Sequence, residues 1–200
     1  MTDRAPTESE VRGEDWGGRE LVQETFTRVA FVEVDLSEVG TDRSVFQECT
    51  FRGVRFNVSE HRSSAFLNCT FLRCTFFDAS FTGCKLTGSR FQDCTLDLLK
   101  VEGGEWSFVG LAGANLGSAC FRDVRMREAD LTGVRATNGT LTGVDLSGAS
   151  WTKADLTGCD LRGSDLSALD PATVRLRGAK ITYQQAVTLA VAQGLDVLPE

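Results

Sequence analysis

Large apolar residues recur along the chain at every fifth position, always at numbers that end in 1 or 6. The series runs from Phe26 to Ile181, and eleven of the thirteen phenylalanines lie on it. Small or β-branched residues dominate two positions earlier, and 13 of the 20 glycines lie two positions later. A period of five would wind around a whole helix, and in a strand it would alternate between the two faces. The pattern therefore predicts a chain that turns the same way after every five residues.

The glycines indicate where the chain turns. In the segment 141–144, Leu-Thr-Gly-Val, glycine is third of four, where a type II turn requires a positive φ. Small and large residues two positions apart then point to the same inner side, with polar residues outside. Such a coil buries its apolar side only when further coils stack on it.

A short motif, in which aspartate or asparagine stands between a small residue and leucine, recurs in the second half of the chain. It reads ANL at 114–116, ADL at 129–131 and 154–156, VDL at 144–146, CDL at 159–161 and SDL at 164–166. With this motif the chain resembles the pentapeptide-repeat family over about residues 16 to 181. The resemblance implies an all-β fold: a right-handed quadrilateral β-helix of about eight coils, with a short C-terminal α-helix. The square cross-section comes from the resemblance, because the period of five alone does not fix it.

Two stretches are similar to the mycobacterial MfpA type, relatives of the Qnr quinolone-resistance proteins. They are SEHRSSAFLNCTF at 59–71 and the tail at 155–195. This resemblance implies a dimeric rod that imitates B-form DNA, binds DNA gyrase or topoisomerase IV, and protects the enzyme from fluoroquinolones. Qnr members carry projecting loops, whereas the unbroken period predicts a rod without loops.

The expected organisation has three parts. Residues 1–13 are polar and acidic, so we expect a disordered extension there. We expect the β-helix over residues 14–181 and a helix over residues 182–194. Thr182 and Gln185 have the spacing of a capping box, and Gly194 suits the position after the helix. The helix is apolar around most of its circumference, so we expect it to cover the last coil and also to form a twofold dimer. The expected dimer contacts are Tyr183, Ala186, Val187, Ala190, Val191 and Leu195; capping alone is the alternative.

The charge of the chain limits its partners. The formal net charge is −7, which argues against direct nucleic-acid binding but suits a basic protein surface. The sequence contains no apolar run long enough to span a membrane, and its N-terminus lacks the apolar core of a signal peptide. We therefore expect a cytoplasmic protein.

Aspartates accumulate toward the C-terminal end. Residues 128–170 contain seven acids and three bases, whereas acids and bases balance over residues 77–127. The candidate partner-binding residues, as an acidic DNA-mimic surface, are Asp130, Asp145, Asp155, Asp160, Asp165 and Asp170. The alternative is local, because aspartate at this motif position can bond the backbone of its own turn.

No residue pattern points to catalysis. The single histidine, His61, lies on the inward period, twenty residues after Thr41, so in a four-sided coil the two residues stack on the same face in adjacent coils. We expect His61 to be hydrogen-bonded or partly turned outward; direct contact with a partner is the alternative. Six of the seven cysteines are separated by multiples of five, which indicates buried small residues rather than a metal site. The segment GGEW at 103–106 indicates a local irregularity. We expect no enzyme activity, cofactor or metal.

Three classes of non-enzymatic function can be compared against these observations. The first is a non-enzymatic, DNA-mimicking gyrase-binding protein, and the acidic end and terminal helix favour it. The second is a structural scaffold for protein–protein interaction without a topoisomerase target, because one fold serves many functions. A ligand-binding or ice-binding solenoid would need an ordered row of threonines on one outer side, and the outward positions are instead mixed.

Overall fold

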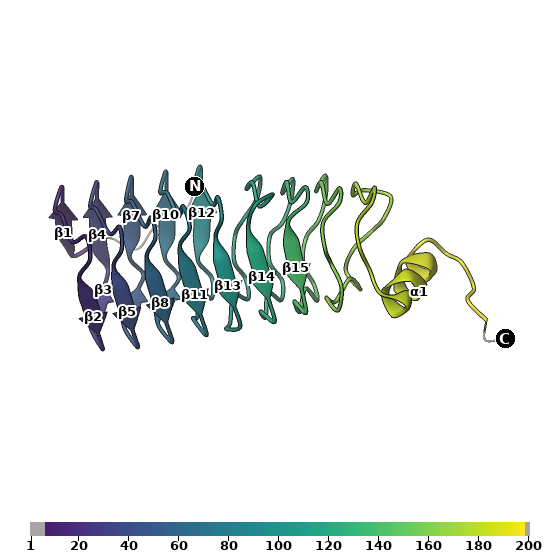
Figure 1. The fold of residues 1–200 in the computed structure, drawn as a ribbon, viewed down its shortest axis with the longest axis horizontal. Helices are drawn as coiled ribbons and strands as arrows, with labels where there is room; N and C mark the ends of the chain where they lie inside the picture. Colours follow the sequence, from purple (N-terminus) through teal and green to yellow (C-terminus); the bar gives the residue numbers. More distant parts are fainter. Residues whose placement is uncertain (1–6, 199–200) are drawn as a thin grey trace.

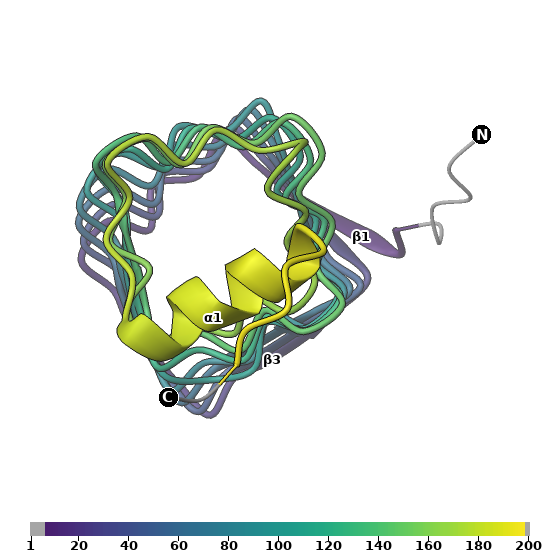
Figure 2. The same cartoon turned by 90° about the vertical axis from the view of Figure 1, so that its right-hand side faces the viewer.

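A computed structural model describes residues 7–198 as a rod of stacked coils that ends in one helix (Figure 1). Seen along the rod, the coils have four sides, and the helix lies across the C-terminal end (Figure 2). All strand pairs are parallel, and paired residues are twenty apart, as in Phe31 with Phe51 and Phe51 with Phe71. Five residues therefore make one side and twenty make one coil. The predicted β-helix with a short C-terminal helix is confirmed.

The four sides are named in chain order by their inward residues. The first face is centred on Phe31, the second on Leu36, the third on Thr41 and the fourth on Phe46, with further members at intervals of twenty. The first face contains β1 (Ser9–Arg12), β4 (Val29–Val32), β7 (Thr50–Arg52), β10 (Thr70–Leu72) and β12 (Arg90–Gln92).

The third face forms the longest sheet, with seven strands. These are β2 (Glu20–Val22), β5 (Gly40–Asp42), β8 (Glu60–Arg62), β11 (Ser80–Thr82), β13 (Lys100–Glu102), β14 (Cys120–Arg122) and β15 (Thr140–Thr142). The fourth face has β3 (Thr25–Thr27), β6 (Val45–Gln47) and β9 (Ala65–Leu67). The second face is joined by single bridges, and bridges also extend the third face through Asp160 to Lys180.

The core consists of columns of side chains that run along the rod. On the first face, the rings of Phe31, Phe51, Phe71 and Phe91 stack with centroids 4.9, 4.9 and 4.7 Å apart. These distances match the spacing of about 4.8 Å between neighbouring strands. Farther along the first face the column continues with Leu111, Leu131 and Trp151, which are also buried. The predicted inward series is therefore the core.

The inner corners are filled by the small residues that precede each large one. Ser89 Oγ donates to the Phe66 carbonyl at 2.7 Å, and Cys69 Sγ donates to the Phe46 carbonyl at 3.3 Å. Each bond links residues 23 apart, in neighbouring coils. All seven cysteines are free; five are buried and two are half-buried.

The turns have the predicted backbone geometry. Gly143 has a φ of 64°, as the type II turn requires. Eighteen residues other than glycine also have a positive φ in the described part of the chain, and all stand at the same turn position, at numbers that end in 3 or 8. The fold thus accepts side chains at a position where the sequence pattern shows a preference for glycine.

The boundaries differ from those predicted at the N-terminus. β1 lies inside the segment 1–13 that we expected to be a disordered extension, and it pairs with β4, so the stack begins at about Ser9 rather than at residue 14. Residues 1–6 of the expected extension lie outside the described residues. At the other end, α1 (Tyr183–Ala192) falls within the predicted range 182–194. No helix among the described residues has the length and apolar character to cross a membrane.

Candidate partner-binding surface

The six candidate aspartates lie around the C-terminal part of the rod, on all four sides. The step of five residues per side places Asp130 and Asp170 on the first face, Asp155 on the second, Asp160 on the third, and Asp145 and Asp165 on the fourth. The structure therefore brings them to one end of the molecule but does not gather them on one side.

Each of these aspartates stabilises its own turn. One carboxylate oxygen accepts a hydrogen bond from the backbone N–H two residues later, over distances from 2.8 Å at Asp165 to 3.3 Å at Asp160. This bond is the one expected from the local alternative. It occupies one oxygen of each carboxylate and leaves the other oxygen free for a cation or a partner.

The six aspartates fall into two groups, according to whether the second carboxylate oxygen pairs with an arginine. Asp145 pairs with Arg127 at 2.6 Å, Asp160 with Arg162 at 2.7 Å, and Asp155 with Arg175 at 3.3 Å. In the described part of the chain, Asp130, Asp165 and Asp170 make no ion pair, and their side chains are exposed. Sequence analysis did not separate the groups, although opposite charges twenty residues apart, as in Asp155 and Arg175, are a readable signal.

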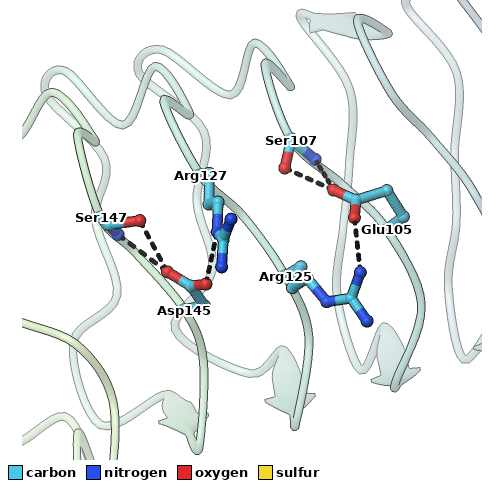
Figure 3. A network of polar contacts seen from close by, with 6 residues as sticks. All are labelled: Glu105, Ser107, Arg125, Arg127, Asp145 and Ser147. Atoms are coloured by element: carbon cyan, nitrogen blue, oxygen red, sulfur yellow. Dashed lines mark hydrogen bonds and ion pairs between the residues drawn. The ribbon is translucent and has the colours of Figure 1, made fainter.

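The fourth face shows how such pairing neutralises charge (Figure 3). Arg125 and Arg127 stand on either side of one inward residue. Arg125 reaches back one coil to Glu105 at 3.2 Å, and Arg127 reaches forward one coil to Asp145. Ser147 donates its backbone N–H and its hydroxyl to the other oxygen of Asp145, at 3.2 and 2.8 Å. Partial burial opposes ionisation of Asp145, but these hydrogen bonds outweigh it and lower the pKa of the carboxyl group.

Four carboxylates that make no ion pair within the described residues flank one corner of the rod. Asp165 lies on the fourth face, Asp130 and Asp170 lie on the first face, and Glu128 stands at the corner between these faces. We call these four residues the acidic corner. The bases of the last coil, Arg175, Arg177 and Lys180, follow on the second and third faces.

The C-terminal helix has a buried side and an exposed side. Leu189 packs against the core, and Gln185 is only 7% exposed. Of the expected dimer contacts, Tyr183 is 85%, Val191 56% and Leu195 58% exposed. Ala186 is also exposed, while Val187 and Ala190 are half-buried. Sequence analysis missed the exposed Val197 and Leu198, which follow the helix in the chain.

The buried side of the helix is attached to the last coil by its capping residue. Thr182 and Gln185 form the predicted capping box. The Gln185 side chain also donates through Nε2 to the carbonyl oxygens of Leu161 at 2.6 Å and Ser164 at 2.7 Å. The capping expectation did not include this second contact, because it depends on where the helix lies.

His61 is a core residue. Its ring is 1% exposed and stacks on Phe81 with centroids 4.4 Å apart. Thr41 Oγ1 lies 2.9 Å from Nδ1, and Ser59 Oγ lies 3.0 Å from Nε2. The expectation of a hydrogen-bonded ring is confirmed, and the alternative of an outward ring is wrong. Burial lowers the pKa of the ring to about 3.

The C-terminal end of the rod offers a partner carboxylates and exposed apolar side chains. Within residues 7–198, no three histidine, cysteine, aspartate or glutamate side chains form a group suited to a metal ion. The acidic corner and the exposed side of the helix, both at the C-terminal end, are thus the features that suit a protein partner best.

Comparison with known proteins covers most of the rod. Residues 20–97 match the description "Pentapeptide repeat region", and residues 111–148 and 141–170 match "Pentapeptide repeats (8 copies)". The chain is 39% identical over 91 residues to the pentapeptide repeat protein MfpA of Mycobacterium tuberculosis (strain ATCC 25618 / H37Rv), which is 46% of this chain and 50% of that protein.

Two further proteins are similar. MfpA of Mycolicibacterium smegmatis (strain ATCC 700084 / mc(2)155) is 50% identical over 46 residues, 23% of this chain and 24% of that protein. The chain thus spans half or less of the length of these curated relatives. Among solved structures, full-length QnrB1, a plasmid-mediated fluoroquinolone resistance protein, has 19% identity and a TM-score of 0.37, over 93% of this chain and 100% of that chain.

Proposed function

Because the chain belongs to the pentapeptide-repeat family, we propose that it is a non-enzymatic, DNA-mimicking protein that binds a type II topoisomerase. The target is DNA gyrase or topoisomerase IV, and binding modulates the enzyme and protects it from fluoroquinolones or from a natural gyrase poison. The similarity to MfpA supports this assignment, although it covers only half of that protein.

The acidic corner is the observation that carries the proposal. Asp130, Asp165 and Asp170 are exposed and make no ion pair within the described residues. Asp130 and Asp170 lie two coils, about 10 Å, apart along the first face, and Asp165 lies on the adjoining fourth face. Fixed negative charges on a rigid rod are what a DNA-binding surface recognises in a phosphate backbone. The turn hydrogen bonds support this role, because they hold each carboxylate in a fixed position.

The helix extends the acidic surface through dimerisation. Tyr183, Val191 and Leu195 present an apolar surface at the end of the rod, next to the last coil. A twofold axis through this helix would place the acidic ends of two rods side by side at the centre of a longer rod. We therefore include a homodimer through α1 in the proposal.

A supercoiling assay tests this function. Purified protein is added to DNA gyrase and relaxed plasmid, with and without ciprofloxacin. We expect inhibition of supercoiling at high protein concentration and less drug-induced DNA cleavage at lower concentration. If neither occurs with gyrase or with topoisomerase IV, the second function, a protein–protein interaction scaffold without a topoisomerase target, is the better assignment.

A further inference from the structure

Three apolar residues occupy turn positions that suit neither their shape nor their polarity. Val58, Leu98 and Phe108 have positive φ angles of 61°, 58° and 59°. In the described part of the chain, the other fifteen non-glycine residues with a positive φ are polar or charged. Left-handed backbone is least costly for glycine, asparagine and aspartate, and β-branched valine is strained there.

Burial does not compensate for this strain. Val58 is 46%, Leu98 44% and Phe108 55% exposed, so each leaves about half of an apolar side chain in water. An asparagine would fit the backbone better and would be better solvated. Residues that break a local rule without a gain in folding are expected where a protein binds something.

Two of these residues lie near a third exposed apolar side chain on the same corner of the rod. Val58 and Leu98 lie on the corner between the second and third faces, two coils apart, and Phe77, 49% exposed, lies on the coil between them. The Val58 N–H donates to the Phe77 carbonyl at 2.8 Å, which fixes the two as neighbours. Asp78 occupies the corner between Val58 and Leu98, and its carboxylate pairs with Lys100 of the next coil. We call Val58, Phe77 and Leu98 the apolar stripe.

An acidic hollow continues the stripe toward the N-terminus. It has a volume of about 320 Å³ and is lined by Glu20, Glu38, Gly40, Val58, Glu60 and Arg62. Val58 thus belongs to both the hollow and the stripe. A Cβ atom at Gly40 would lie 2.1 Å from Glu20 Oε2, so glycine is what leaves room for the glutamate here. Three carboxylates face one guanidinium, and that guanidinium already pairs with Glu60.

We propose that the stripe and the hollow together bind an extended segment of another protein that carries a lysine or arginine followed by apolar residues. The cation enters the hollow, where the carboxylates are in excess, and the apolar side chains cover Val58, Phe77 and Leu98. From Glu20 to Leu98 the surface crosses four intervals between coils, about 19 Å. An extended segment of about six residues has this length.

The size of the surface favours a peptide segment over a second copy of the chain. Three half-exposed side chains offer far less than the roughly 800 Å² that each partner contributes to a stable interface. This surface lies on the N-terminal half of the rod, away from the acidic corner and α1, so it goes beyond the proposed gyrase binding.

A peptide array tests the proposal with the full chain as the labelled probe. The immobilised hexapeptides carry one lysine followed by two leucines or phenylalanines. Matched peptides replace the lysine by glutamate or the apolar residues by serine. We expect binding to the basic–apolar set and a loss of about tenfold or more for either matched set. The triple variant V58N/F77S/L98N should bind all peptides weakly, and E38Q/E60Q should no longer prefer lysine over glutamate.

Phe108 supplies the matched control. The F108N substitution removes an exposed apolar residue with the same backbone conformation from a different corner, so peptide binding should be unchanged. Circular dichroism and thermal melting establish that each variant is folded. Three results would overturn the proposal: no preference for basic–apolar peptides, an equal loss of binding in F108N, or a wild-type dimer that V58N/F77S/L98N converts to monomer in sedimentation, which would assign the stripe to a second copy.

Discussion

The side-chain amide of Gln185 donates to the backbone carbonyl of Leu161 at 2.6 Å and so joins the C-terminal helix to the coil beneath it. The same nitrogen donates to the Ser164 carbonyl. The last coil has no further coil whose polar groups could donate to its carbonyls, and one buried amide therefore donates to two carbonyls at the open end of the stack.

Replacement of Gln185 by alanine should destabilise this end of the rod by about 2 kcal/mol, because the Ser164 carbonyl loses its donor and the Leu161 carbonyl keeps only the Ser164 N–H. Hydrogen exchange should increase first in residues 156–166, ahead of the rest of the rod. The neighbouring Gln184 is exposed, and Gln184→Ala should change stability by less than about 0.5 kcal/mol. Equal effects of the two substitutions on denaturant unfolding would contradict this role.

Adjacent glycines at positions 103 and 104 should respond very differently to alanine. A Cβ atom at Gly104 would lie 2.1 Å from the Cys84 carbonyl oxygen, and its φ is 94°. Gly103, with a φ of 62°, has no atom within 4 Å of such a Cβ. We expect Gly104→Ala to cost several kcal/mol and Gly103→Ala about 1 kcal/mol. Chemical denaturation of both variants tests the difference, and similar midpoints would show that the backbone near Cys84 relaxes.

Stability should depend on the protonation of His61. The folded ring has a pKa of about 3, whereas an exposed histidine titrates near 6.5, so between these values the unfolded chain binds the extra proton. His61 therefore does not lower the free energy of unfolding above about pH 6.5. On acidification toward pH 3, it lowers that free energy by up to about 1.4 kcal/mol per pH unit. Urea unfolding between pH 5 and 7 measures this slope above the range in which carboxylates titrate.

His61→Phe is the matched variant for this dependence. Phenylalanine occupies the same inward position in the next coil, at Phe81, so the stack should form. The variant should lose the slope between pH 5 and 6.5. If the slope remains, other groups are responsible for it.

The acidic corner should contribute more to gyrase affinity than the paired aspartates. Asparagine keeps the oxygen that accepts the turn hydrogen bond and removes the charge, so the fold should be retained. We expect Asp165→Asn and Asp170→Asn each to weaken binding severalfold, with a larger effect at low salt. Asp145→Asn is the control, because Arg127 already neutralises that charge. Unchanged binding in all three variants, with intact circular dichroism, would exclude these residues from the interface.

Substitution on the exposed side of α1 should separate the dimer without unfolding the chain. Val191 in α1 and Leu195 just after it are each more than half exposed, so Val191→Ser with Leu195→Ser should leave the far-UV circular dichroism of the folded chain unchanged. Sedimentation should show twice the chain mass for the wild type and a single chain mass for the variant. A wild-type mass that stays monomeric at all concentrations would refute dimerisation through this helix.

Sequence alone could not decide whether the side chain of His61 is buried or exposed. The period of five placed it inside, but a polar residue in that series is equally compatible with a local outward turn. Thr41 and Ser59 decide the matter, because they provide hydrogen-bond partners for both ring nitrogens inside the core. Gln185 is similar: the sequence indicates its capping role, and only the position of the helix over the last coil gives its side chain the two carbonyls.

The sequence by itself determined that the chain turns after every five residues and stacks in coils, because a large apolar residue every five positions and a glycine-rich turn position bury the apolar side only in this way. It also determined the C-terminal helix, because the capping box and the final glycine are local signals. Only the tertiary structure decided which charges meet. Each side takes five residues and each coil takes twenty, so acids close in sequence, such as Asp155 and Asp160, lie on different faces. Asp130 and Asp170, forty residues apart, lie on the same face, and the acidic corner exists only in three dimensions.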